Sequence, residues 1–206
     1  MSKGYFITGI GTDVGKTVAS AILVKALDAD YWKPIQCGEL DNSDSMKVQN
    51  LTGCRVFPEA YRLERPMSPH AAAAAEGLEV ALDSFLRPQT NKHLIVEGAG
   101  GVLVPLNNLQ TVADLITHLH VPVIVVSRHY LGSINHTLLT LDLLKQRGIG
   151  IAGVLFNGDE NAATESIILE LSGVKVLGRI PVIQELNATS VAAAADNLRS
   201  QLLKNL

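Results

Sequence analysis

The stretch GIGTDVGKT (residues 9–17) follows the apolar run YFIT (residues 5–8) and leads directly into the helical pattern VASAILVKAL (residues 18–27). A strand, a glycine-rich loop and a helix in this order are the context of a phosphate-binding loop. The glycines let backbone N–H groups face an anion, and the N-terminus of the helix adds its dipole. Lys16 is placed to reach the terminal phosphates of a nucleotide, and the hydroxyl of Thr17 suits Mg²⁺. Five residues lie between the first and last glycines of the stretch, one more than in the common form of this loop.

Short β-branched runs alternate with longer amphipathic stretches on both sides of this loop, which is typical of βαβ units. The run VPVIVV (residues 121–126) has no polar alternation, as expected of a strand covered by helices on both faces. We therefore expect an α/β fold, a single domain over residues 1–206 with a doubly wound, mostly parallel sheet flanked by helices. The expected strands cover residues 5–8, 31–35, 94–96, 121–126, 149–156 and 174–180, and the first helix covers residues 16–27. Prolines interrupt the pattern between residues 40 and 87, so we expect one or two helices and long loops there.

The composition narrows the class of protein. The chain has 206 residues, of which 47% are hydrophobic, and this is enough for one globular domain with a two-sided sheet. The formal charge of −3 and the lack of basic runs argue against nucleic acid as a partner. The two cysteines have no paired spacing and the start MSKGYF has no apolar stretch of a secretory signal, so we expect a cytoplasmic protein. Apolar runs are far shorter than the about 20 residues that cross a bilayer, so no membrane role is expected.

An acidic residue follows the apolar run LIV in LIVEGAGG (residues 94–101). We expect Glu97 to lie at the carboxyl end of a strand, where doubly wound sheets bind their ligands. There it would hold Mg²⁺ directly or through water. The alternative is an exposed acid before a glycine turn.

Two further charged residues are candidates for the same crevice. Lys33 comes at the end of the second expected strand, beside a proline that stops the strand, so its ammonium would point into the crevice. Asp44, in NSDSMKVQ, could bind a metal ion or cap a helix, and capping is the commoner use of such an aspartate.

Several classes of nucleotide-binding protein share this loop. Switch GTPases read guanine with an NKxD motif, but the corresponding strand here ends in FNGDE, so guanine specificity is not expected. Partitioning ATPases of the ParA and MinD kind carry a signature lysine in the loop, and this chain has Gly11 at that position. That class is therefore disfavoured, although its fold is close. A kinase that phosphorylates a small molecule stays open as an alternative, because the loop does not reveal the acceptor.

The wider chain resembles the dethiobiotin synthetase family over nearly its whole length. The resemblance is carried by ordered blocks: GTDVGKT, KPIQCG, SPHAAAAAEG, VEGAGGVLVPL, LGSINHTLLTL, and GVLFNG followed by GRIPVI. It implies an ATP-dependent ligase of biotin biosynthesis. In that family, CO₂ or bicarbonate converts one amine of diaminononanoate, a diamino fatty acid, into a carbamate, which attacks the γ-phosphate of MgATP. The second amine then displaces phosphate from the resulting carbamic-phosphoric anhydride and closes the ureido ring, so that dethiobiotin, ADP and phosphate are formed.

The resemblance also implies roles for matching positions. The triphosphate would be surrounded by Thr12, Asp13, Val14, Gly15, Lys16 and Thr17, and Mg²⁺ would be held by Thr17, Asp44 and Glu97. Lys33 would hold the carbamate and the phosphoryl group as they approach, and with Lys16 and Thr12 it makes up the expected catalytic set.

The remaining implied contacts concern the base and the fatty acid. Asn157 and Pro181 would lie at the adenine, although a strand-end asparagine is on its own more often a turn former. The substrate would contact Lys33 and Cys37, and its carboxylate would be received by backbone N–H groups of Gly132, Ser133, Ile134 and Asn135 at a helix start. An ordinary helix cap by Ser133 is the alternative reading of that turn. The family further implies a homodimer in which each active site is shared between the subunits.

The chain departs from the family pattern at three of these positions. Cys37 stands where the family usually has Ser or Thr, so one hydroxyl contact is weaker or missing. Gly158 replaces an acid that often follows the base-reading asparagine, and this leaves the base selectivity open. Asp13 replaces a common Glu, which we expect to be a mild change. His70 lies in one of the matching blocks, but its residue type and position assign it no chemical role.

Overall fold

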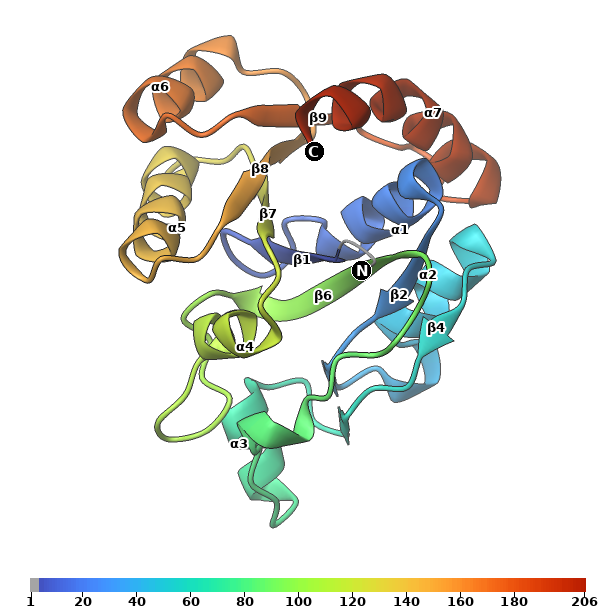
Figure 1. Ribbon diagram of the computed structural model, residues 1–206, viewed down its shortest axis with the longest axis vertical. Coiled ribbons are helices and arrows are strands. Elements are labelled where there is room, and N and C mark those ends of the chain that lie inside the picture. Colours follow the sequence, from blue (N-terminus) through green and yellow to red (C-terminus); the bar gives the residue numbers. More distant parts are fainter. Residues whose placement is uncertain (1–3) are drawn as a thin grey trace.

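A seven-stranded sheet runs through the centre of the protein (Figure 1). The computed structural model describes residues 4–206; residues 1–3, the start of the MSKGYF stretch discussed above, lie outside the described residues. The strands of this sheet are β1 (Gly4–Gly9), β2 (Ala29–Trp32), β4 (Val56–Phe57), β6 (His93–Gly101), β7 (Val123–Arg128), β8 (Ile151–Asn157) and β9 (Val176–Ile180). Their spatial order is β4-β2-β6-β1-β7-β8-β9, and every neighbouring pair is parallel.

Helices cover both faces of the sheet. They are α1 (Lys16–Leu27), α2 (Asp44–Thr52), α3 (Pro69–Ala75), α4 (Val112–Leu119), α5 (Ser133–Gln146), α6 (Ala162–Ser172) and α7 (Ala188–Asn205), with short 3-10 turns at Leu40–Asn42 and Leu82–Ser84. The helices α1, α2 and α7 pack together on one face, while α4, α5 and α6 lie over the other (Figure 1). The expected doubly wound parallel α/β fold is therefore confirmed.

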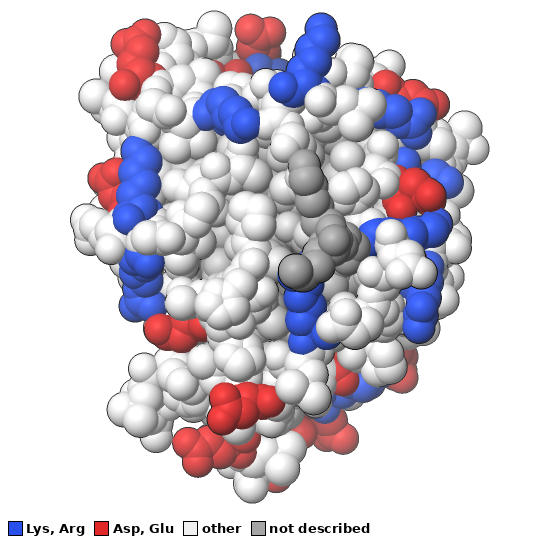
Figure 2. Space-filling view, viewed as in Figure 1, with Lys and Arg blue, Asp and Glu red and all other residues white. Residues whose placement is uncertain are grey.

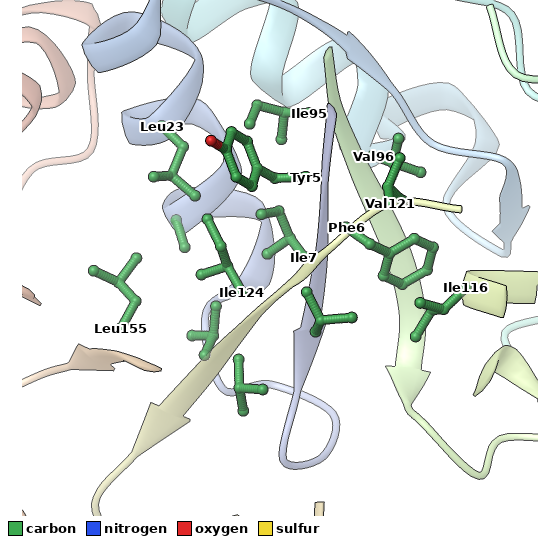
Figure 3. Packing of buried hydrophobic residues seen from close by; sticks show 14 of the residues in the cluster. Tyr5, Phe6, Ile7, Leu23, Ile95, Val96, Ile116, Val121, Ile124 and Leu155 are labelled. Atoms are coloured by element: carbon green, nitrogen blue, oxygen red, sulfur yellow. The ribbon is translucent and has the colours of Figure 1, made fainter. Parts of the chain in front are cut away.

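The buried core follows the two-residue period of the central strands. Figure 3 shows Phe6 pointing toward Ile116 of α4, whereas the next residue, Ile7, points to the opposite side, where Leu23 of α1 lies. All six residues of β1 are buried, as expected of a strand with a helix layer on each side.

Two predictions about the strands were wrong in detail. The expected second strand, residues 31–35, is split, because Pro34 has no N–H to donate and ends β2 just beyond Trp32. The chain then forms β3 (Ile35–Cys37), which pairs in parallel with β5 (Tyr61–Leu63) in a separate two-stranded sheet. Residues 40–87 contain the expected helices α2 and α3, but also the strands β4 and β5, which are too short to produce a readable period.

The order of the strands locates the place for a ligand. From β1 the chain moves outward to β2 and β4, and later it returns to insert β6 beside β1 and to continue in the other direction through β7. In open parallel sheets, the carboxyl ends of the strands at such a reversal form a crevice that binds ligands. The loops after β1 and β2 and the last part of β6 meet there.

Charged residues are spread thinly over the surface. On the face drawn in Figure 2, Lys and Arg side chains alternate with Asp and Glu around a largely uncharged centre. Within the described residues, no helix combines the length and the apolar character that spanning a bilayer requires.

Candidate active site

The phosphate-binding loop lies between β1 and α1, as the sequence predicts. The helix α1 begins at Lys16, directly after Gly15, whose backbone is left-handed with φ 91°. The side chain of Lys16 is 8% exposed, and its Nζ donates a hydrogen bond of 3.0 Å to the carbonyl of Gly11. Burial lowers the pKa of Lys16, although the carboxylate of Glu97 works in the opposite direction. The ammonium therefore curls over the loop, at the position that an anion bound by the loop would occupy.

Asn157 braces this loop from the end of β8. Its Nδ2 donates to the carbonyl of Val14 at 2.8 Å. A Cβ atom added at Gly15 would lie 2.1 Å from that Nδ2, so another residue here would displace the Asn157 amide, and the left-handed backbone itself favours glycine. The last residue of β8 and the start of α1 are therefore interlocked.

Glu97 lies inside the strand, not at its end. The expectation that the strand stops at this residue was wrong, because β6 continues as far as Gly101, which pairs with Gly9 beyond an irregularity in the register. The side chain is not an exposed acid either, since it is fully buried. Its Oε1 accepts hydrogen bonds from Thr17 Oγ1 at 2.9 Å and from Lys33 Nζ at 3.3 Å. The carboxylate is thus held between the phosphate-binding loop and the segment that follows β2.

Lys33 bridges the two acids of the crevice. Its Nζ lies 2.9 Å from Asp44 Oδ2 and 3.3 Å from Glu97 Oε1, and its side chain is 5% exposed. Burial alone would lower the pKa of Lys33, but the two carboxylates outweigh it and raise this pKa. The pKa of Asp44 is lowered, because the charge of Lys33 overcomes the opposing effect of burial. Lys33 and Asp44 are therefore both ionised at neutral pH.

Asp44 is not the cap of its helix. The N-cap of α2 is Ser43, whose Oγ accepts a hydrogen bond from the backbone N–H of Met46. Asp44 occupies the first helical position, and its side chain is free to contact Lys33. Capping therefore does not account for Asp44.

The crevice has a volume of about 910 Å³. Nine of the predicted residues line it together: Thr12, Asp13, Gly15, Lys16, Thr17, Lys33, Cys37, Asp44 and Glu97. The sequence analysis did not assign the wall formed by residues 66–69, just before and at the start of α3, nor Lys47 and Leu186, which also line the crevice. The two prolines in RPMSP were the available signal for the wall. Burial raises the pKa of Cys37 to about 11, so its sulfur faces the crevice as a neutral thiol.

The other predicted residues lie outside this cavity. Val14 is buried beneath the loop and Pro181 is exposed just after β9. The segment 132–135 forms the start of α5, at the same edge of the sheet. It lies beside a neighbouring apolar groove of about 440 Å³ that is lined by His136 and Leu139 and shares Thr12 with the crevice. Capping of α5 by Ser133 was wrong as an alternative: the N-cap is Gly132, with φ 103°, and Ser133 is the first helical residue.

A glycine-rich loop at a strand-to-helix turn, with a buried lysine and an acid on the neighbouring strand, defines the class of phosphate-binding-loop nucleotide-binding proteins. A family model described as an AAA domain matches residues 3–190. The ATP-dependent dethiobiotin synthetase BioD of Christiangramia forsetii is 52% identical over 98% of this chain and 99% of its own, and that of Cytophaga hutchinsonii is 51% identical over 95% and 97%. The chain therefore belongs to the dethiobiotin synthetase family.

Solved structures agree on the fold. The MinC:MinD cell division protein complex of Aquifex aeolicus matches with a TM-score of 0.56 at 12% identity, over 100% of this chain and 97% of that one. A putative plasmid partition protein of Borrelia burgdorferi bound to AMPPNP matches with a TM-score of 0.54 at 10% identity, over the whole of both chains. At these identities the likeness concerns the architecture alone.

Proposed function

We propose that the protein is an ATP-dependent dethiobiotin synthetase. It would convert diaminononanoate, CO₂ and ATP into dethiobiotin, ADP and phosphate through a carbamic-phosphoric anhydride. The observation that carries the proposal is the cluster of Thr17, Lys33, Asp44 and Glu97 beside the phosphate-binding loop, in which Lys33 and Glu97 are buried. It occurs in a chain about half identical to synthetases over nearly its full length. The residues that line the crevice would bind the triphosphate and the carbamate side by side.

The side chains at the centre of the crevice fit Mg²⁺. Thr17 Oγ1 and Glu97 Oε1 lie 2.9 Å apart, and Asp44 approaches the same point through its contact with Lys33. Hydroxyl and carboxylate oxygens are the ligands that Mg²⁺ takes in sites where phosphates complete its coordination. Thr17, Asp44 and Glu97 would therefore hold the ion, which would offset the charge of the β- and γ-phosphates.

Two lysines would carry the phosphoryl transfer. Lys16 would leave the carbonyl of Gly11 for the terminal phosphate, with Thr12 of the loop beside it. Lys33 would exchange its carboxylate contacts for the carbamate and the γ-phosphate, and would spread the negative charge that keeps two anions apart. A compact ammonium suits this task better than a planar guanidinium, since it contacts several oxygens as a point charge.

The adenine of ATP and the carboxylate of the fatty acid would be bound at a distance from the reacting groups. Adenine would lie near Asn157 and Pro181, where Asn157 would have to give up its bond to the loop or share it. The substrate carboxylate would be received at the start of α5, by backbone N–H groups of residues 132–135.

A homodimer would bring the start of α5 to the crevice of the partner. In its own chain this segment lies beside the apolar groove and not in the crevice. Leu131, just before this segment, is fully exposed, and Leu139, further along α5 and in the lining of the groove, is 60% exposed. Exposed leucines beside an apolar groove favour a covered surface over a solvated one. Each active site would then use the loop of one subunit and the α5 terminus of the other.

Product analysis tests the reaction. The protein is incubated with diaminononanoate, bicarbonate, Mg²⁺ and ATP, and the products are separated and identified. We expect a cyclic urea and free phosphate in equal amounts. A phosphorylated acceptor without ring closure would instead identify a small-molecule kinase, and phosphate release independent of the diamine would identify an ATPase switch.

Mixing two inactive variants tests the shared site. Lys16→Ala removes the lysine that would contact the phosphates. Asn135→Glu places a carboxylate at the third position of α5, from which a glutamate reaches back to the N-cap N–H and would occupy the proposed receptor. Half of the randomly exchanged dimers are heterodimers with one intact site each, so mixing should restore about a quarter of the wild-type rate. Asn135→Gln is the neutral control and should stay active alone. No recovery after verified subunit exchange would place both segments in one chain's own site.

We also propose that residues 1–206 form one domain, which is supported by the single large sheet and the continuous buried core. The cytoplasmic location stays a prediction.

A further inference from the structure

The carboxylate of Glu97 has a third hydrogen-bond donor, which comes from inside the sheet. The hydroxyl of Tyr31 donates to Glu97 Oε2 at 2.9 Å. Both side chains are fully buried. Tyr31 is not among the residues that line the crevice, so it contacts neither the phosphates nor the fatty acid.

The pairing of the strands fixes this contact. In the parallel pair of β2 and β6, Tyr31 lies opposite Ile95, and the next pair is Trp32 and Val96. Side chains two residues apart on a strand point to the same face, so Tyr31 lies below Lys33 and Ile95 lies below Glu97. Trp32 points the other way, where its Nε1 donates to the carbonyl of Pro58. Tyr31 therefore reaches Glu97 from beneath, along the strand direction.

The three donors to Glu97 differ in what ligand binding does to them. Thr17 and Lys33 donate to Oε1, on the side that faces the crevice, and both would turn to a metal ion or a phosphate. Tyr31 donates to Oε2 from a paired strand and has no competing partner in the crevice.

We propose that Tyr31 is a positioning residue that holds the Glu97 carboxylate with Oε1 turned toward the metal. The inference rests on the proposed function, in which Glu97 is a ligand of Mg²⁺. When the metal and the nucleotide draw Thr17 and Lys33 away, the bond from Tyr31 is the one that remains and keeps the carboxylate from rotating about its last torsion. Outer-shell partners of this kind orient the ligands of metal sites and tune their affinity.

The test measures metal-dependent nucleotide binding and requires no turnover. Calorimetry gives the affinity for ADP with Mg²⁺ and with EDTA, for the wild type and for Tyr31→Phe, which keeps the ring and loses the hydroxyl. We expect the Mg²⁺-dependent gain in affinity to fall by about 10-fold, the lower range for the loss of an outer-shell partner, while the metal-free affinity is unchanged. Titration with Mn²⁺, followed by electron paramagnetic resonance, should show the same fall in metal affinity.

Tyr5→Phe is the matched control. Tyr5 is a second buried tyrosine, on β1 of the same sheet, with its ring beside His93 at the amino end of β6. Its replacement should leave both affinities unchanged. If Mg²⁺ raises the affinity for ADP equally in Tyr31→Phe and in the wild type, the positioning role is wrong. It is also wrong if Tyr31→Phe loses affinity for ADP in EDTA, because the effect would then not act through the metal. If wild-type protein gains nothing from Mg²⁺, the proposed magnesium site itself is wrong.

Discussion

Lys33→Gln should slow the chemical step on the order of 10³-fold, the scale for losing a preorganised charge at a developing anion, while the affinity for MgATP does not fall. The reason is the position of Lys33 Nζ between Asp44 and Glu97, where its charge would act mainly on the carbamate and the phosphoryl group as they approach. Single-turnover measurements with preformed carbamate separate this rate from binding.

The same substitution should lower the free energy of unfolding by about 3 kcal/mol, because two carboxylates, one of them fully buried, lose their counter charge. Assays therefore run well below the midpoint of thermal unfolding of the variant. Lys92→Gln is the control, since it removes a lysine that pairs with Asp28 on the surface, and its rate and stability should match wild type. A normal single-turnover rate in Lys33→Gln, with ATP binding lost, would contradict the assigned role.

Lys16→Ala should reduce turnover at least on the order of 10³-fold at saturating MgATP, with the midpoint of thermal unfolding unchanged. Among residues 4–206, the ammonium of Lys16 has one hydrogen-bond partner, the carbonyl of Gly11, so the folded chain loses one hydrogen bond. In the reaction, by contrast, the ammonium would face the phosphoryl group that is transferred. Rates of ADP formation measured together with circular dichroism test both parts.

Lys25→Ala supplies the comparison for Lys16→Ala, because Lys25 lies on the same helix α1 but faces solvent. Full activity in Lys25→Ala and near-wild-type turnover in Lys16→Ala together would show that the loop does not bind the reacting phosphates.

The sequence predicted those parts of the site that depend on local signals. The bounds of α1 are those expected, because the loop glycines and the apolar run that follows fix both ends. Lys33 was located correctly, since the proline after it stops the strand wherever the strand lies in the sheet. These parts of the site lie close in sequence to the glycines and the proline that determine their positions.

The parts that were missed depend on distant contacts. Tyr31 looked like an ordinary strand residue, and its role becomes visible only when β6 is known to pair with β2 across a separation of about sixty residues. The period of two from Lys33 was the available hint. Glu97 was assigned to the end of its strand because the apolar run LIV stops just before it, whereas Gly101 pairs with Gly9 and extends the strand. Asn157 was expected only at the base, and its bond to Val14 joins segments far apart in the chain.

The charged groups at the centre of the crevice are already paired with one another, so a charged ligand that binds there has to replace an existing ion pair. A divalent cation that takes Asp44 and Glu97 alone leaves the buried Lys33 without a counter-ion. An anion that takes Lys33 alone leaves two acids without theirs. Each ligand would remove the penalty that the other creates, so we expect their affinities to be coupled and the coupling to be reciprocal. The crevice would then bind a cation and an anion cooperatively.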